Sequence, residues 1–356
     1  MVIHQVLALF REGKQISIKH FFVVLFLSFL FFSTALEAHG QLGSSTSSSQ
    51  TKKATNKIIT ATSVRVRSEP RLSGKEVATL NLGALVKSTE KSANKDKVGQ
   101  KEDFWYKVTT QDKKTGWVFG GFLINYEEAK SEIIYLKIAT ERLKLEDADF
   151  GDYLDLYNFL LRVTPEVKNR EIVAELELYK LQALAKSLET IPFDKQNKSS
   201  YSDFTKKHES KIVYSEPAGQ WFVRAELLWN LSARYRTLAI GERIAWAASQ
   251  TPIPGECEGD VSCYLGLIRM TNGEYLKIYP NGAHEKDSLQ QISELFAPIV
   301  SDLAKKETYT FPEGSEERRE ARKTISELRA ILKQVGDSPA KDIVTNQLDQ
   351  LYKAFQ

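Results

Sequence analysis

The apolar residues of this chain follow two different periods, one before and one after Tyr126. Between residues 58 and 125, β-branched and aromatic residues alternate with polar ones, as in the stretch SVRVR at residues 63–67. Such alternation places successive side chains on opposite faces of a strand. The stretch from Trp105 to Leu123 alternates on both sides of a polar turn at residues 112–114, and predicts a hairpin.

Beyond Tyr126 the apolar residues recur every three to four positions, which is the spacing of one helical face. One helix is expected between Thr164-Pro165 and Ile191-Pro192, and another from Pro217 onward. The expected apolar stripes are Leu181, Leu184 and Leu188; then Trp221, Ala225, Leu228 and Tyr235; then Ile325, Leu328, Leu332 and Val335; and finally Val344, Leu348, Leu351 and Phe355. Trp221, Trp229 and Trp246 are expected to pack in this helical core, because aromatic residues at helical spacing usually do.

Basic residues followed by an uninterrupted apolar run open the chain. Three basic residues, Arg11, Lys14 and Lys19, precede the apolar residues 21–32. This order is typical of a secretory signal peptide, and the run is shorter than the roughly 20 residues of a membrane-spanning helix. We expect a signal peptide over residues 1–35, with no membrane span in the mature chain. The alternative is an uncleaved membrane anchor.

A serine-rich segment follows the expected signal peptide. Residues 43–55, GSSTSSSQTKKAT, have almost nothing to bury, and a flexible linker is therefore expected over residues 36–57. The whole chain of 356 residues is 42% hydrophobic and 27% charged, which is ordinary for globular domains and leaves room for two of them. Its 49 basic and 46 acidic residues nearly balance, so no nucleic-acid partner is expected.

Four spaced motifs in the alternating region resemble one family. They are Val66-Arg67-Ser68-Glu69-Pro70, Leu80-Asn81-Leu82-Gly83, Trp105-Tyr106-Lys107-Val108 and Gly116-Trp117-Val118. In this order they are similar to the motifs of the bacterial SH3-like (SH3b) domains of secreted envelope proteins. The resemblance covers residues 58–125 and implies a small β-barrel. The expected fold class is therefore α+β multidomain: a small SH3-like β-barrel followed by an all-α helical domain, residues 126–356, built as an array of helical hairpins.

The same resemblance and the strand alternation select candidate ligand-binding aromatics. The alternation predicts a barrel core that includes Tyr106, Val108, Trp117 and Val118. Trp105 is then left near the surface, close to Phe122. Either it packs as a lid on the barrel edge or on the helical domain, or it faces a ligand, as at the matching place in SH3-like folds. The candidate ligand-binding residues are Trp105, Phe119 and Phe122. Because Phe119 and Phe122 replace a proline and a tyrosine of the eukaryotic relatives, proline-rich peptides are not expected as ligands.

The two cysteines, Cys257 and Cys263, enclose a short polar segment. An even number of cysteines in a chain expected to be exported favours a disulfide between them. One alternative is a metal site with His284, which would still lack ligands. The other is a catalytic cysteine with His284 as its base, as in cell-wall peptidases with attached SH3-like domains, but the helical pattern around the cysteines does not fit those enzymes. No metal site is expected.

Two further segments of the helical half resemble known local motifs, a calcium loop and a helix-turn-helix joint. Residues 146–155, EDADFGDYLD, resemble a calcium loop only in their acidic residues and glycine, and Asn158 stands where a closing glutamate is required, so a helix start is expected. Residues 275–292 are similar to the helix-turn-helix joint of tetratricopeptide-like envelope proteins. There, Pro280-Asn281-Gly282 can end one helix and start the next.

These features favour a non-enzymatic exported envelope protein, periplasmic or secreted. It would bind cell-wall peptide, glycan or a protein partner through its SH3-like domain, with the helical domain as scaffold. The alternative is a cell-wall hydrolase with an SH3-like targeting domain and an acidic active site in the helical half, where spacing does not distinguish Glu226 or Glu242 from other carboxylates. No cofactor is expected, since the chain lacks G-x-S-x-G, H-E-x-x-H and a phosphate-binding glycine loop.

Overall fold

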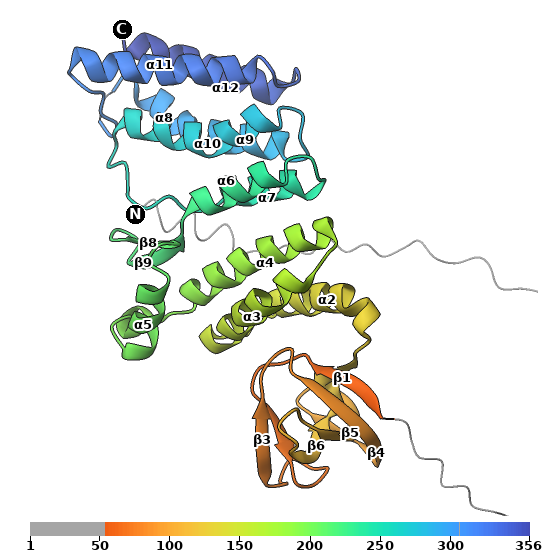
Figure 1. Cartoon of the computed structure of the whole chain (residues 1–356). Helices are drawn as coiled ribbons and strands as arrows, with labels where there is room; N and C mark the ends of the chain where they lie inside the picture. Colours follow the sequence, from red (N-terminus) through yellow and green to blue (C-terminus); the bar gives the residue numbers. More distant parts are fainter. Residues whose placement is uncertain (1–53, 306) are drawn as a thin grey trace, which may run out of the picture. The chain divides into compact units, whose positions relative to one another are not determined.

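The computed structural model of the chain describes residues 54–305 and 307–356 (Figure 1). The predicted signal peptide, residues 1–35, and nearly all of the predicted linker lie outside the described residues. The first strand begins at Thr55, inside the predicted linker. Residues 55–57 belong to this strand because they pair with residues 86–88 of the fourth strand.

Seven strands form one antiparallel sheet in the order β3-β2-β6-β5-β4-β1-β7. Their bounds are β1 Thr55–Ile59, β2 Val64–Arg67, β3 Glu76–Leu80, β4 Leu85–Val98, β5 Lys101–Thr109, β6 Thr115–Phe119 and β7 Leu123–Asn125. The 3₁₀ turn η1, Gly120–Phe122, joins the last two strands. The α+β fold class is therefore confirmed, with a sheet-rich domain ahead of a helical region.

The core of this sheet is made of aliphatic side chains from six of its seven strands. Its buried members are Ile59, Val64, Val66, Val86, Val108, Val118 and Leu123. The core prediction is correct for Val108 and Val118. Tyr106 is half-buried and packs against this core, whereas Trp117 is half-buried and does not belong to it. Trp105, which was expected near the surface, is only 2% exposed.

A bulge in β4 explains why strict alternation fails at Trp105. Lys91 pairs with Tyr106 but Lys95 pairs with Phe104, so β4 carries two extra residues opposite Trp105. Such a bulge bends the strand and increases its twist. The bulged segment closes over Trp105: the Ser92 hydroxyl accepts a hydrogen bond from the Trp105 N–H at 3.0 Å, and the Asp96 carboxylate accepts one from the indole Nε1 at 3.0 Å.

The second half of the chain is helical except for one hairpin. Its helices are α2 Ser131–Leu143, α3 Phe150–Val163, α4 Arg170–Glu189, α5 Ser199–Lys207, α6 Ala225–Arg234, α7 Ile240–Ser249, α8 Val261–Met270, α9 Asn272–Ile278, α10 Glu285–Asp302, α11 Ser315–Leu332 and α12 Pro339–Ala354. No helix in the described ranges is long and apolar enough to cross a membrane. The stripes of α11 and α12 are buried, as predicted.

The hairpin corrects the prediction of a helix that begins at Pro217. Strands β8, Ile212–Ser215, and β9, Gln220–Val223, pair here, and Trp221 lies on β9 beside Tyr214 rather than on the stripe of a helix. Gly219 has φ +61 in the turn, a conformation that side chains disfavour. β-branched and aromatic residues on both sides of this turn stabilise a hairpin. Helix α6 begins only at Ala225.

Three apolar clusters follow one another through the helical region. The first joins α2 to α5 and the β8–β9 hairpin, the second joins α4, α6 and α7, and the third joins α7 to α12. The first cluster also contains Ile58 and Leu82 of the sheet-rich domain. Successive helices therefore bury their stripes against their neighbours in the chain.

Helix α3 contacts the sheet-rich domain directly. The Leu82 N–H donates to the Asp155 carboxylate at 3.0 Å, and the Arg162 guanidinium donates to the Leu82 carbonyl at 2.9 Å. The Phe159 ring lies against Gly83, where an added Cβ would come within 2.4 Å of the ring. Apolar packing and two charge-assisted hydrogen bonds thus join the two domains at residues 82–83.

Three local predictions are also settled by the structure. Asp149 caps α3 in a capping box with Asp152, so residues 146–155 are a helix start. Residues 280–282 lie in the turn between α9 and α10, although the tetratricopeptide resemblance itself stays a prediction. Cys257 and Cys263 form a disulfide, with their Cα atoms 5.4 Å apart.

Replacing Gly83 by alanine tests the contact between the domains. Both Gly83, φ +80, and Gly99, φ +60, have left-handed conformations, but an added Cβ at Gly99 meets no atom within 4 Å. Backbone strain therefore affects both variants, and only Gly83→Ala also collides with Phe159. We expect it to lower the free energy of unfolding by about 2 kcal/mol more than Gly99→Ala, as measured by denaturant titration. Equal losses in the two variants would show that the contact with Phe159 adds no stability.

Removing the disulfide tests the second structural constraint. The bridge closes a short loop ahead of α8, and the variant Cys257→Ser with Cys263→Ser should lose about 2 kcal/mol of unfolding free energy through the loop entropy it releases. Thiol titration of unfolded protein prepared without reductant should detect no free thiol. Two titratable thiols in that preparation would contradict the pairing.

Candidate functional site

The three predicted ligand-binding residues line one groove on the sheet-rich domain. Trp105, Phe119 and Phe122 come from β5, β6 and η1, and the groove has a volume of about 320 Å³. We call it the aromatic groove. Its other lining residues are Ala61, Thr62, Ser63, Val64, Arg65, Arg67, Leu72 and Val98. The β1–β2 loop and β2 therefore form one wall, and the tip of the β4–β5 hairpin contributes to the other.

The aromatic rings form a continuous edge-to-face row. The centroids of Trp105 and Phe119 are 5.7 Å apart, and those of Phe119 and Phe122 are also 5.7 Å apart. Trp105 and Phe119 are each only 2% exposed, whereas Phe122 is half-buried. Of the two interpretations left open for Trp105, burial favours the lid that packs on the barrel edge over the ligand-facing aromatic. Phe122 is therefore the most accessible of the three rings.

Two glycines bring Phe122 close to this row. A Cβ on Gly120 would lie 2.6 Å from the Tyr106 ring, and one on Gly121 would lie 2.6 Å from the Phe119 ring. Only glycine therefore allows η1 to turn so tightly against β5 and β6. The Lys101 ammonium lies 5.3 Å from the centroid of the Phe122 ring and donates to the Gly121 carbonyl at 2.9 Å.

Guanidinium groups border the aromatic groove. Arg65 is paired with Glu76 at 3.4 Å, and both side chains are largely exposed. Arg67 donates to the Gly74 carbonyl at 2.8 Å, which uses one of its five N–H donors. Because an exposed ion pair is weak and exchanges readily with other partners, the two arginines can bind a carboxylate. The groove therefore offers an apolar floor with a basic border.

An arginine of the helical domain, Arg142, connects that domain to the border of the groove. Arg142 of α2 donates to the Thr62 hydroxyl at 3.0 Å and forms an ion pair with Asp152 of α3. Burial acts to raise the pKa of the Asp152 carboxyl, but the hydrogen bond and charge of Arg142 outweigh it and leave this pKa below its usual value. Asp152 is thus charged at neutral pH, and it orients the arginine that contacts Thr62.

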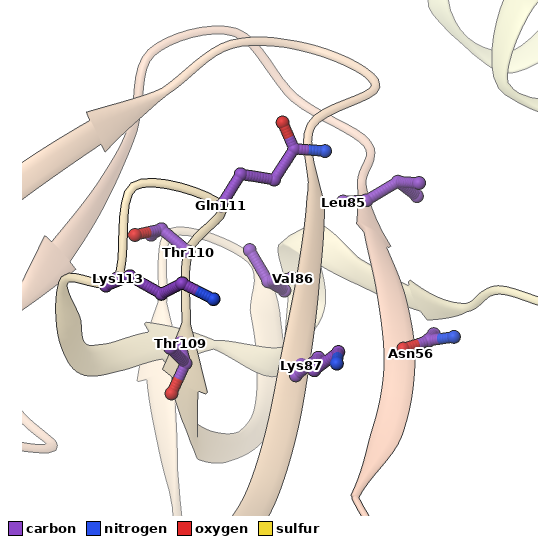
Figure 2. A pocket seen from close by; sticks show the side chains of 8 residues that line it. All are labelled: Asn56, Leu85, Val86, Lys87, Thr109, Thr110, Gln111 and Lys113. Carbon is purple, nitrogen blue, oxygen red and sulfur yellow. The ribbon is translucent and has the colours of Figure 1, made fainter.

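A second hollow on the same domain has a different character. It has a volume of about 360 Å³ and is lined by Asn56, Leu85, Val86, Lys87, Thr109, Thr110, Gln111 and Lys113 (Figure 2). We call it the basic hollow. It shares no lining residue with the aromatic groove and contains no aromatic side chain. This hollow was not predicted from the sequence, because its residues come from β1, β4, the end of β5 and the β5–β6 turn.

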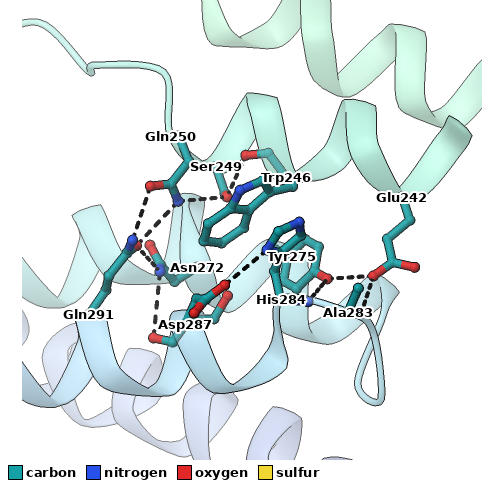
Figure 3. A network of polar contacts seen from close by, with 11 residues as sticks. Glu242, Trp246, Ser249, Gln250, Asn272, Tyr275, Ala283, His284, Asp287 and Gln291 are labelled. Atoms are coloured by element: carbon teal, nitrogen blue, oxygen red, sulfur yellow. Dashed lines mark hydrogen bonds and ion pairs between the residues drawn. The ribbon is translucent and has the colours of Figure 1, made fainter. Parts of the chain in front are cut away.

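The residues considered for catalysis have other contacts. The thiols of Cys257 and Cys263 are joined to each other. His284 lies 2.9 Å through its Nδ1 from the Asp287 carboxylate, and its ring stacks on Trp246 with centroids 4.3 Å apart (Figure 3). These contacts fix the ring at the start of α10 and hold it against α7.

Glu242 belongs to the same polar network. Its Oε1 accepts from the Tyr275 hydroxyl at 2.7 Å and from the Ala283 N–H, and the Tyr275 oxygen accepts from the His284 N–H at 3.0 Å (Figure 3). Burial, and then the Glu242 carboxylate, raise the pKa of Tyr275 above its usual value, so Tyr275 stays a donor. The network ties α7 to α9 and to the turn before α10.

Other chemistry is not indicated in the part of the chain that the structure describes. Glu226 is an exposed residue in the first turn of α6. No group of three or more His, Cys, Asp or Glu residues within residues 54–305 and 307–356 is arranged to hold a metal ion. The aromatic groove therefore remains the site in which predicted residues converge.

Comparison with known families identifies the domain that carries this groove. Residues 62–124 match the bacterial SH3 domain family, so this part of the chain is a bacterial SH3 domain. All three aromatic residues of the groove and both of its arginines lie inside the matched segment. No curated protein and no solved structure matches the chain.

Mutation can test the burial of Trp105 and the partial exposure of Trp117, which are the reverse of what the strand alternation predicts. Trp105→Ala should lower the free energy of unfolding by about 3–5 kcal/mol, because it leaves a cavity beside Phe119 and frees the Asp96 carboxylate. Trp117→Ala should cost about 1 kcal/mol or less, since its ring is half-buried and lies outside the apolar core of the sheet, with the Lys107 ammonium 5.9 Å from its centroid. Denaturant titration of both variants decides this point, and a greater loss for Trp117→Ala would contradict the burial described here.

Proposed function

We propose that this protein is a non-enzymatic, exported envelope protein that binds a cell-wall component through the aromatic groove of its bacterial SH3 domain. The observation that carries the proposal is the convergence of Trp105, Phe119 and Phe122 with a basic border inside the matched domain. A bacterial SH3 domain suggests a cell-wall binding or targeting module. The disulfide is consistent with a location outside the cytoplasm.

The chemistry of the groove favours the peptide part of the cell wall over its glycan. Wall peptides have small apolar side chains and free carboxylates. The half-buried Phe122 ring can contact an apolar side chain, and Arg65 and Arg67 can bind a carboxylate beside it. A sugar ring stacks best on a broadly exposed aromatic face, and the indole of Trp105 is buried.

The helical domain has the role of a scaffold in this proposal. It holds the SH3 domain through α3 at Leu82 and through Arg142 at Thr62. A non-enzymatic role is supported by the contacts of the rival catalytic groups, since the two thiols are paired and Glu242 accepts two hydrogen bonds. A cell-wall hydrolase with an SH3 targeting domain remains the alternative that experiment must test.

Truncating Phe122 tests the groove without removing its buried floor. Phe122→Ala should weaken retention of the full chain on purified cell wall about tenfold, because interface aromatics often contribute more than about 1 kcal/mol. The matched control is Lys113→Ala in the basic hollow, which should bind like the parent. Binding is measured by co-sedimentation, and circular dichroism confirms that both variants are folded.

Two outcomes of the same experiment would contradict the proposal. Retention that is lost in Lys113→Ala and kept in Phe122→Ala would assign binding to the basic hollow. A zymogram with purified cell wall should show no cleared band for the parent chain, and a lytic band that survives purification would favour the hydrolase.

A further inference from the structure

Two hollows of the helical region lie side by side along strand β9. One, of about 400 Å³, is lined by Val213 of β8, Val223 at the end of β9, the start of α6, residues 252–254 and the junction of α8 and α9. The other, of about 270 Å³, is lined by α4, β9 and the end of α7 with the residues that follow it. They share Val223 and Pro252 as lining residues. Together they form a trough that we call the edge trough.

Strand β9 has an unpaired edge in the part of the chain that the structure describes. It pairs with β8 alone, and Val223 lies opposite Ile212. The Arg224 N–H donates to the Lys211 carbonyl at 2.9 Å. In an antiparallel pair the hydrogen-bonded positions alternate, so Phe222 also bonds to β8. Trp221 and Val223 therefore direct their N–H and C=O groups away from β8.

These backbone donors have no partner among the described residues. No described acceptor receives a hydrogen bond from the N–H of Trp221 or of Val223, although Val223 is only 3% exposed. Buried backbone N–H groups are nearly always paired, and an unpaired strand edge is a template for another strand. Val223 lines both hollows and Trp221 lines the smaller one, so the free edge borders the trough, while the Val223 side chain itself packs in the first helical cluster.

The side chains of the edge trough define the chemistry of an occupant. Apolar groups line it on both sides of Val223, including Trp229, Ile253 and Met270, whose surface is 53% exposed. The charged lining groups without an ion pair to another described residue are Glu189, Glu226 and Arg224, whereas Arg269 and Glu274 are paired with each other at 2.7 Å. The unpaired charges have a net negative sign.

From this geometry we propose that the edge trough binds an extended peptide segment, with apolar residues and a basic side chain, as a third strand on the free edge of β9. The N–H and C=O groups of Trp221 and Val223 supply the backbone hydrogen bonds. The apolar walls take alternate side chains, which is how strand addition combines affinity with selectivity. Glu189 or Glu226 receives the basic group. This site is separate from the aromatic groove and does not depend on cell-wall binding.

A capped model heptapeptide can test strand addition on the full chain. The probe has the order lysine, valine, threonine, valine, threonine, valine, lysine, and its control has the same sequence with N-methyl groups on alternate backbone nitrogens. We expect saturable binding of the probe, monitored by tryptophan fluorescence, and about tenfold weaker binding of the control, because two or more backbone hydrogen bonds are lost. Equal affinity of the two peptides, or no binding of the probe, overturns the proposal.

Amide hydrogen exchange locates the bound strand. The N–H groups of Trp221 and Val223 should exchange at least about tenfold more slowly when the probe is saturating, since new hydrogen bonds protect them. Unchanged exchange at both positions, or protection at Tyr214 on β8 instead, overturns the assignment to the β9 edge.

Charge variants test the selectivity of the trough. Glu189→Gln combined with Glu226→Gln should weaken the lysine probe about threefold to tenfold. The matched control is Glu216→Gln in the β8–β9 turn, outside the trough, which should bind the probe like the parent. An unchanged affinity of the double variant would overturn the role of the carboxylates, and with it the basic partner.

Discussion

The contact between residues 82–83 and helix α3 is the constraint on which the arrangement of this protein depends. Leu82 is buried in the first helical cluster, its backbone is held from both sides by Asp155 and Arg162, and Gly83 leaves room for the Phe159 ring. Ile58 of β1 packs in the same helical cluster, so residues 82–83 and β1 together hold the SH3 domain on the helices. With them, the aromatic groove has a fixed neighbour, and Arg142 can reach Thr62 at its border.

Most of the fold followed from the period of the apolar residues, because that period reflects which face of an element is buried. The change of period at Tyr126 separated strands from helices, and the stripes of α11 and α12 matched the buried residues. The hairpin β8–β9 was missed, since four-residue strands are too short for a helical and a strand pattern to differ clearly. Gly219 lies between two runs of β-branched and aromatic residues, which is typical of a hairpin. The predicted apolar stripe nevertheless included Trp221, so the helix was predicted to begin at Pro217 instead of at Ala225.

The sequence selected the three aromatic residues of the candidate site, but it did not predict how deeply each ring is buried. Trp105, Phe119 and Phe122, selected from the motifs of the SH3 domain, line one groove, and ligand binding there stays a prediction. Alternation then placed Trp105 outward, and this failed because alternation assumes a regular partner strand, whereas β4 bulges over Trp105. The arginines at the border, and the contact from Arg142, depend on residues distant in sequence. No local pattern can report such contacts.

Because the two domains share a core, the SH3 domain cannot be transferred to another protein without exposing buried side chains. Ile58 is 1% exposed and Leu82 is not exposed at all, and both owe this burial in part to the helical cluster. If the domain were transferred to another protein, these two side chains would lie on its surface and form an apolar patch, which favours association. Recombination in evolution would therefore have to move α2 and α3 along with the barrel, so that the exchangeable unit is larger than the segment that carries the family motifs.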